Sequence, residues 1–310
     1  MAVSPDDLDI FPLTAAPQGA SVGSAKAPAL AGPHITAQAR DIGVRLQRWA
    51  QAAAQQVLRA AGTAVLALVL PALLYALWWT AAERHWIAEQ ILPPPAFVWE
   101  SLLSVIDSGE LLDHVKVSAA RVAWSLLIGG SAGLLLGLGM GLSRSFKAYV
   151  FPTFDVLAQL PVLGWIPLLI IFVGIEEPLK VSAVSIAVVV PVALSTLQGI
   201  ANIPQAWLEV GRVYGLGRWQ TLSRVVLPAA TPALFTGLRQ GVMQAWLSVV
   251  FVELLSSSEG LGFLMAYSRS LSQIDMVIVA MLAIGVVGLL IELALRLIEA
   301  RLQRWRRNAF

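Results

Sequence analysis

Long stretches without charged residues alternate with short charged segments along most of the chain. Six such stretches cover residues 60–82, 122–143, 156–175, 181–208, 225–252 and 276–291, and only the fifth contains a charge, Arg239. About 20 apolar residues are needed to span a bilayer as a helix. The pattern therefore predicts an all-α membrane protein with six transmembrane helices, the last extending to about residue 297.

The basic residues gather in alternate connections between these stretches. Fifteen of the 21 Lys and Arg residues lie before the first stretch, in the second and fourth loops, or after the last stretch. The other loops are rich in Asp and Glu. Loops with excess Lys and Arg are usually cytoplasmic. Both termini are therefore predicted to be cytoplasmic, which requires an even number of spans.

The composition excludes several classes of protein. The chain is 57% apolar and 13% charged, whereas soluble globular proteins are about 45–50% apolar and about 25% charged. A soluble enzyme, a disordered linker and a nucleic-acid-binding protein are therefore not expected. The absence of cysteine excludes disulfides and thiolate metal sites, and we expect no metal site and no catalytic residues.

The ends of the chain differ from its middle. Residues 1–33 are rich in Ala, Pro, Gly and Ser and are typical of disorder, and they lack the pattern of a secretory signal. Residues 37–61 fit either an amphipathic helix at the lipid surface or a solvated helix. We therefore expect a cytoplasmic extension over residues 1–60, a six-span domain over 61–300, and a basic tail over 301–310.

The second stretch carries a glycine every four residues, which we call the glycine stripe. Its members are Gly129, Gly133, Gly137 and Gly141. Small residues on one face allow close packing of transmembrane helices. We interpret the stripe as a packing surface; a face along which the helix slides is the alternative.

The third stretch is interrupted by Pro161 and Pro167 on either side of Gly164. Each proline removes a backbone hydrogen bond and kinks a helix. Irregular backbone in a membrane is tolerated where it is buried or lines an aqueous cavity. Gln159 and Trp165 are candidates for lining a translocation path, and a kinked helix that only packs is an equal alternative.

The fifth stretch holds the polar groups Arg239, Gln240, Gln244 and Trp246, with Glu253 at its far end. A charge inside a membrane is a functional candidate, so the first four are further candidates for the path. For Arg239 we favour the alternative that it snorkels to the cytoplasmic interface. For Glu253 we favour an external interface, either solvated or paired with a local donor.

The fourth loop, residues 202–228, is too long for a simple connection. Pro204 fits the first turn of a helix, and Gly215 fits the left-handed residue that ends it. Trp207 and Tyr214 fall on one face of this helix. The pattern predicts a rigid element that contacts a cytoplasmic partner.

The second half of this loop predicts a short helix that begins after Gly217 and passes through Arg218. Pro228 then opens the fifth span. Glu209, Gly215, Val225 and the Leu227-Pro228 pair resemble the EAA loop of bacterial ABC-importer permeases. Val210 and Gly211 replace the two alanines of that motif, and Val225 replaces its isoleucine.

Other stretches resemble the branch of this family that imports sulfonates, taurine and nitrate. They are Leu92-Pro93-Pro94-Pro95, Gly164-Trp165-Ile166-Pro167-Leu168, Thr236-Gly237-Leu238-Arg239, Ala245-Trp246 and Gly260-Leu261-Gly262. The resemblance covers about residues 91–300. It implies the type I ABC importer permease fold in the bacterial inner membrane, as a multi-pass subunit.

The resemblance also implies partners. In that family two permease copies pair, two ATP-binding cassette ATPase subunits grip the EAA loops, and a periplasmic substrate-binding protein delivers substrate. By this resemblance Glu209, Gly215, Leu227 and Pro228 shape the coupling loop, and Trp207, Tyr214 and Arg218 contact the ATPase. None of the four lysines follows a glycine, so no phosphate loop exists and Mg-ATP is expected on the partner chain.

The substrate implied by the resemblance is a small anion, first an aliphatic sulfonate including taurine, then nitrate, cyanate or bicarbonate; a neutral heterocycle is a further alternative. Two other classes are considered. A membrane-embedded enzyme is disfavoured because all three histidines lie outside the spans. A stand-alone secondary transporter is disfavoured because the spans hold no proton relay and no internal repeat. We also expect the chain to contact lipid, and we do not expect it to bind nucleic acid.

Overall fold

The computed structural model describes residue 66 and residues 68–302. The chain divides into two compact units, Met1–Ala72 and Leu73–Phe310. Of the first unit, only residues 66 and 68–72 are described, and they are helical. The predictions for residues 1–60 and for the basic tail lie outside the described residues, except that residues 301 and 302 end the last helix.

The regular structure of the described residues is helical throughout, as predicted. An apolar helix, Leu68–Glu83, comes first. It is followed by α2 (Pro95–Asp107), α3 (Glu110–Leu142), α4 (Arg144–Ala158), the 3-10 helix η1 (Val162–Trp165), α5 (Ile166–Val173), α6 (Glu177–Ala201), α7 (Gln205–Val213), α8 (Arg218–Thr221), the π-helix η2 (Leu222–Val226), α9 (Leu227–Ser256), α10 (Leu261–Ser270) and α11 (Ile274–Leu302).

Three helices in the described residues are long and apolar enough to cross a membrane: α3, α6, and α11 as far as Arg301. Two pairs of helices, each bent at a short break, are together also long and apolar enough to cross a membrane. One joins α4 to η1 and α5 with a bend of 97°, and the other joins the α8–α9 segment to α10 with a bend of 40°. These residues thus provide three spans, or up to five if each bent pair is one span. The count of six and the side on which the termini lie remain predictions.

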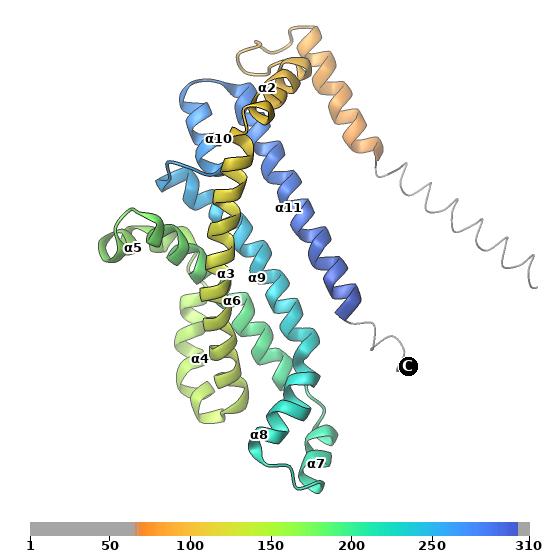
Figure 1. Cartoon of the computed structure of the whole chain (residues 1–310), viewed down its shortest axis with the longest axis vertical. Helices are drawn as coiled ribbons and strands as arrows, with labels where there is room; N and C mark the ends of the chain where they lie inside the picture. The colour runs from red at the N-terminus through yellow and green to blue at the C-terminus, as the bar shows by residue number, and fades with distance from the viewer. Residues whose placement is uncertain (1–65, 67, 303–310) are drawn as a thin grey trace, which may run out of the picture. The chain divides into compact units, whose positions relative to one another are not determined.

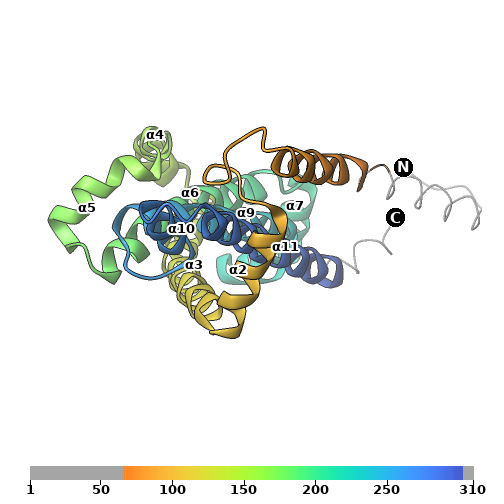
Figure 2. The ribbon, with the colours of Figure 1, turned by 90° about the horizontal axis from the view of Figure 1, so that it is seen from above.

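Helices α3, α6 and α9 pack against one another and form the centre of the second unit (Figure 1). In both views α4 and α5 lie on one side of these three helices and α11 lies on the other (Figure 2). The core contains mainly small and β-branched side chains, among them Ala183, Val184, Val188, Ala245 and Val249. Residues of this size allow helix axes to approach closely.

The glycine stripe of α3 faces α6. A Cβ atom added to Gly133 would lie 2.7 Å from the carbonyl oxygen of Val189, and one added to Gly137 would lie 2.6 Å from that of Ala193. Since Cβ atoms are not found at such distances from backbone, only glycine allows this separation of the two helices.

Helices α6 and α9 approach each other in the same way. A Cβ atom added to Gly237 would lie 2.5 Å from the Cβ of Ser195. Both interhelical approaches therefore depend on residues without a side chain.

The third predicted span differs from the expected kinked helix. The chain turns by 97° between α4 and the η1–α5 segment, so the charge-free residues 156–175 do not form one continuous helix. The predicted loop before them is instead α4, which begins with Ser143 Oγ accepting a hydrogen bond from Phe146 N at 3.2 Å. The break lies at residues 159–161, where Pro161 cannot donate a backbone hydrogen bond.

Two charges that served as span boundaries are buried within helices. Arg121 of α3 is 3% exposed and Lys180 of α6 is 5% exposed. The assignment of Lys180 to an outer loop was wrong. Both residues are held by glutamates: Arg121 by Glu177 and Glu253, and Lys180 by Glu177.

Candidate functional site

The helix pair α7–α8 projects beyond the end of α6 (Figure 1). Helix α7 starts directly after Pro204, and Gly215 adopts the left-handed backbone conformation (φ +67°) just past its end. Both features are those predicted for this loop. The left-handed backbone conformation costs glycine little free energy, whereas it costs other residues about 1–2 kcal/mol.

The outer surface of this pair is aromatic. The side chains of Trp207, Tyr214 and Trp219 are 54%, 80% and 74% exposed. Trp207 and Tyr214 are seven residues apart and share a face of the helix. Large exposed apolar patches mark sites of protein or membrane contact.

The inner surface of the pair fixes its position. Gly211 is buried, and a Cβ atom there would lie 3.7 Å from Leu216 and 3.8 Å from Val225. Glu209 and Arg218 are exposed. The small residue at position 211, where the EAA motif has alanine, thus lets α7 rest against the segment that follows it.

The second half of the loop begins with the predicted short helix, α8, which starts directly after Gly217. Helix α8 continues through the π-helix η2 directly into α9, and Leu227 and Pro228 lie at the start of α9. Pro228 thus lies in the first turn of α9, as predicted, but no loop separates α8 from α9. A proline in the first turn of a helix need not interrupt it.

A second feature is a polar cavity of about 600 Å³ between the end of α4, α6 and α9. Three of the predicted path residues, Gln159, Gln240 and Gln244, line it together, although they come from two distant parts of the sequence. Gln198 and Ser195 of α6 also line it and were not predicted. We call it the glutamine cavity, after its four glutamines.

Arg239 lies away from this cavity. Its guanidinium pairs with Glu292 and with Glu299 of α11, at 3.0 Å from the second carboxylate. Two carboxylates of a neighbouring helix therefore hold the charge, and snorkelling to the cytoplasmic interface stays a prediction. The same pairs neutralise Arg239, so it is not placed to bind an anion in the glutamine cavity.

The two predicted tryptophans also lie outside the cavity lining. Trp246 is 2% exposed and belongs to the core, where its Nε1 donates to the carbonyl oxygen of Ile284 at 3.3 Å. Its burial argues against a path-lining role. Trp165 is half-buried in η1, and its Nε1 has no hydrogen-bond partner among the described residues.

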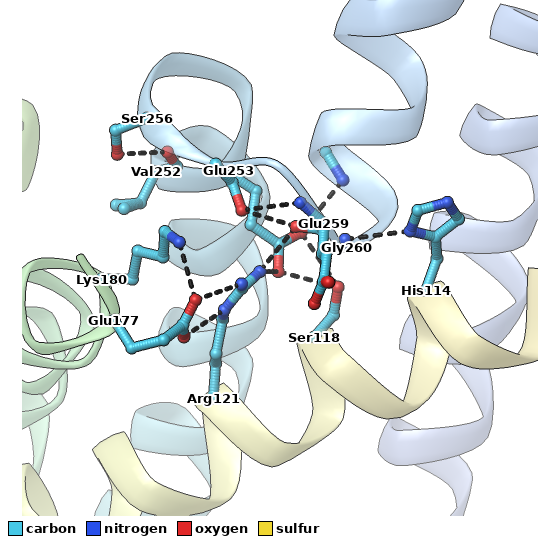
Figure 3. Close-up of polar contacts among 12 residues, drawn as sticks. His114, Ser118, Arg121, Glu177, Lys180, Val252, Glu253, Ser256, Glu259 and Gly260 are labelled. Carbon is cyan, nitrogen blue, oxygen red and sulfur yellow. Dashed lines mark hydrogen bonds and ion pairs between the residues drawn. The ribbon is translucent and has the colours of Figure 1, made fainter. Parts of the chain in front are cut away.

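A third feature joins α3 to the turn 257–260 between α9 and α10 and to the start of α10 (Figure 3). His114 Nδ1 accepts a hydrogen bond from the Gly260 amide at 3.0 Å, and Ser118 Oγ accepts one from the next amide at 3.0 Å. Arg121 Nη1 donates to the carbonyl oxygen of Glu259, the residue before Gly260, at 2.7 Å. These three side chains of α3, which we call the α3 clamp, are spaced by four and three residues and so share one face.

Glu253 of α9 completes the arrangement. Its carboxylate accepts hydrogen bonds from Ser118 at 2.9 Å and from the Gly262 amide at 3.0 Å, and it pairs with Arg121 at 2.7 Å. Its side chain is buried. Of the two expectations for Glu253, a solvated carboxylate was wrong, and pairing with a donor is what the structure shows. The i, i+4, i+7 spacing on α3 is the sequence signal that marks the α3 clamp.

Comparison with known proteins identifies the family. A family model described as "Binding-protein-dependent transport system inner membrane component" matches residues 129–307, a range that includes the α7–α8 pair and the residues that line the glutamine cavity. The chain belongs to this family. Family members are subunits of transporters in the inner membrane and not enzymes, as the residue chemistry indicated.

Two relatives match most of the permease. It is 33% identical over 241 residues to the "Putative aliphatic sulfonates transport permease protein SsuC" of Bacillus subtilis (strain 168), covering 78% of this chain and 87% of the relative. It is 31% identical over 266 residues to the "Taurine transport system permease protein TauC" of Escherichia coli (strain K12), covering 84% and 94%.

A solved structure shows the same fold. A chain of an amino acid ABC transporter superposes with a TM-score of 0.56 at 18% identity, covering 64% of this chain and 98% of the other. The permease therefore shares the fold of an ABC-transporter chain.

Proposed function

We propose that this chain is the permease subunit of an ATP-driven importer whose substrate is an aliphatic sulfonate, taurine included. The family supplies the class of transporter, and the two relatives are named for sulfonates and for taurine. Nitrate, cyanate and bicarbonate are the competing substrates within the same class.

The exposed aromatic face of the α7–α8 pair is the observation that carries the ATP-driven part of the proposal. Trp207 and Tyr214 are largely exposed on a short helix whose end is fixed by Gly215 and whose inner face rests on the following segment. A rigid helix with an aromatic face can insert into a groove of a partner protein. We assign that groove to an ATPase subunit, with Glu209, Arg218, Leu227 and Pro228 shaping or flanking the contact.

The proposed assembly contains a second copy of this chain, two ATP-binding cassette ATPase subunits that hold Mg-ATP, and a periplasmic substrate-binding protein, all at a lipid bilayer. This arrangement places the α7–α8 pair and both termini in the cytoplasm. Closing of the ATPase pair moves the α7–α8 pair, and this movement rocks α6 and α9 of each permease between inward-open and outward-open states.

The test is uptake of labelled taurine by proteoliposomes that hold the permease, its ATPase and its substrate-binding protein. We expect uptake that requires internal Mg-ATP and that is lost with an ATPase subunit unable to hydrolyse ATP. Excess unlabelled alkanesulfonate should compete, and excess nitrate should not. Uptake by the permease alone with only an ion gradient contradicts the ATP-driven class, and competition by nitrate alone contradicts the sulfonate assignment.

A further inference from the structure

We propose that the glutamine cavity is a charge-free binding subsite for the transported sulfonate, in which side-chain amides donate hydrogen bonds to its oxygen atoms. The inference rests on the proposed function and adds to that function the groups that hold the substrate within the permease. The volume of the glutamine cavity, about 600 Å³, lies within the range of about 300–1,000 Å³ found for small-ligand sites.

The lining of the cavity is polar yet uncharged. Its polar side chains are Gln159, Gln198, Gln240, Gln244 and Ser195, and the other lining residues are Leu, Ala, Pro, Val and Ile. A glutamine amide offers two N–H donors and one carbonyl acceptor. Four amides around one cavity therefore provide donors for the three oxygens of a sulfonate and acceptors for an ammonium group such as that of taurine.

The packing of α6 on α9 brings these amides together. Gly237 allows α9 to approach α6 at Ser195, and Gln240 lies one turn further along α9. Ser195 Oγ donates to Gln240 Oε1 at 3.4 Å. Because Ser195 donates to the side-chain oxygen of Gln240, the amide N–H groups of Gln240 remain available to donate to a ligand. Ser195 is therefore a positioning residue.

The other three amides have no side-chain hydrogen-bond partner in the part of the chain that the structure describes. Among the described residues, no side-chain hydrogen bond holds Gln159, Gln198 or Gln244, and all three side chains are exposed. Gln240 and Gln244 are four residues apart and so present their amides on one face of α9. These groups can reorient around a ligand without breaking an existing contact.

The absence of charge in the lining fits a site that must release its ligand. A guanidinium in the lining would add the attraction of an ion pair to its hydrogen bonds with the sulfonate, whereas neutral amides supply hydrogen bonds alone. The nearest arginine in the sequence, Arg239, is instead paired with Glu292 and Glu299 of α11. Neutral donors thus recognise the sulfonate while leaving selection among anions to the substrate-binding protein.

The test uses the reconstituted complex described above, with labelled taurine as the probe. Gln240→Glu and Gln244→Glu are nearly isosteric, and each places a carboxylate in the cavity. We expect either variant to lower taurine uptake at least tenfold, while ATP hydrolysis stimulated by the taurine-loaded binding protein stays within twofold of wild type. Gln240→Asn, which keeps an amide, should retain more uptake than Gln240→Leu.

Gln273→Glu is the matched control, because Gln273 is exposed and does not line the cavity. It should transport as wild type. Uptake by Gln240→Glu and Gln244→Glu within twofold of wild type overturns the subsite, as does a loss of uptake and of ATP hydrolysis in the same proportion. Failure of the wild-type complex to transport taurine with ATP instead counts against the proposed function, so the two failures are distinguishable.

Discussion

Arg121 of α3 and Glu253 of α9 lie 132 residues apart in the chain and form a buried ion pair, with Nη1 2.7 Å from Oε1. Both side chains are almost fully buried. The carboxylate also accepts from Ser118 and from the Gly262 amide, so both charges are satisfied. The pair therefore holds the bend between α9 and α10 against α3.

Removing one partner of this pair should be costly. Arg121→Met leaves a buried carboxylate without its charge partner, and such losses cost about 3–5 kcal/mol. We expect a large drop in the thermal unfolding midpoint of the purified permease in detergent. Lys116→Met is the control, because Lys116 pairs with Asp113 at the surface and exposed pairs contribute about 0–1 kcal/mol. Equal midpoints for the two variants would show that the buried pair is not structural.

The glycine stripe gives a matched pair of substitutions. Gly133→Ala places a Cβ atom 2.7 Å from the backbone of α6 and forces α3 and α6 apart, which we expect to cost about 1–3 kcal/mol. Gly130→Ala, three residues earlier in the same helix, meets no neighbour closer than 3.9 Å. Alanine there should be neutral or stabilising by about 0.5–1 kcal/mol. Thermal unfolding measures both, and an unchanged Gly133→Ala protein would contradict the close packing of these helices.

Arg239 should act on stability and not on substrate binding. Arg239→Gln removes its ion pairs with Glu292 and Glu299 of α11, and we expect a lower thermal unfolding midpoint of the purified permease. The taurine concentration for half-maximal uptake by the folded complex should not change. A tenfold rise in that concentration, with unchanged stability, would instead assign Arg239 to anion binding.

Much of the fold could be predicted because long apolar stretches indicate helices that can cross a bilayer. The charge-free residues of α3 and α6 contain the glycine stripe and the core positions, and the left-handed Gly215 follows from its place after α7. Gln159, Gln240 and Gln244 were each predicted from their polarity, but only the fold shows that they share one cavity with Gln198.

The remaining features depend on contacts between distant residues. Reading every charge as the edge of a span placed Lys180 in a loop, because a sequence window cannot show that Glu177 and its neighbours compensate a buried charge. The pairing of Arg239 could not be predicted for the same reason, since its partners lie on α11. The 97° bend after α4 also depends on packing, because a proline permits a bend without setting its angle.

The central claim, that the α7–α8 pair binds an ATPase, is tested most directly by co-purification. The double variant Trp207→Ala with Tyr214→Ala removes the exposed aromatic face while leaving Gly211 and Gly215 in place. Trp86→Ala, another exposed aromatic outside the pair, is the control. We predict normal insertion of the double variant into the membrane, at least tenfold less ATPase retained on the affinity-tagged permease, and full retention by Trp86→Ala. Retention of the ATPase by the double variant at the wild-type level would contradict the account.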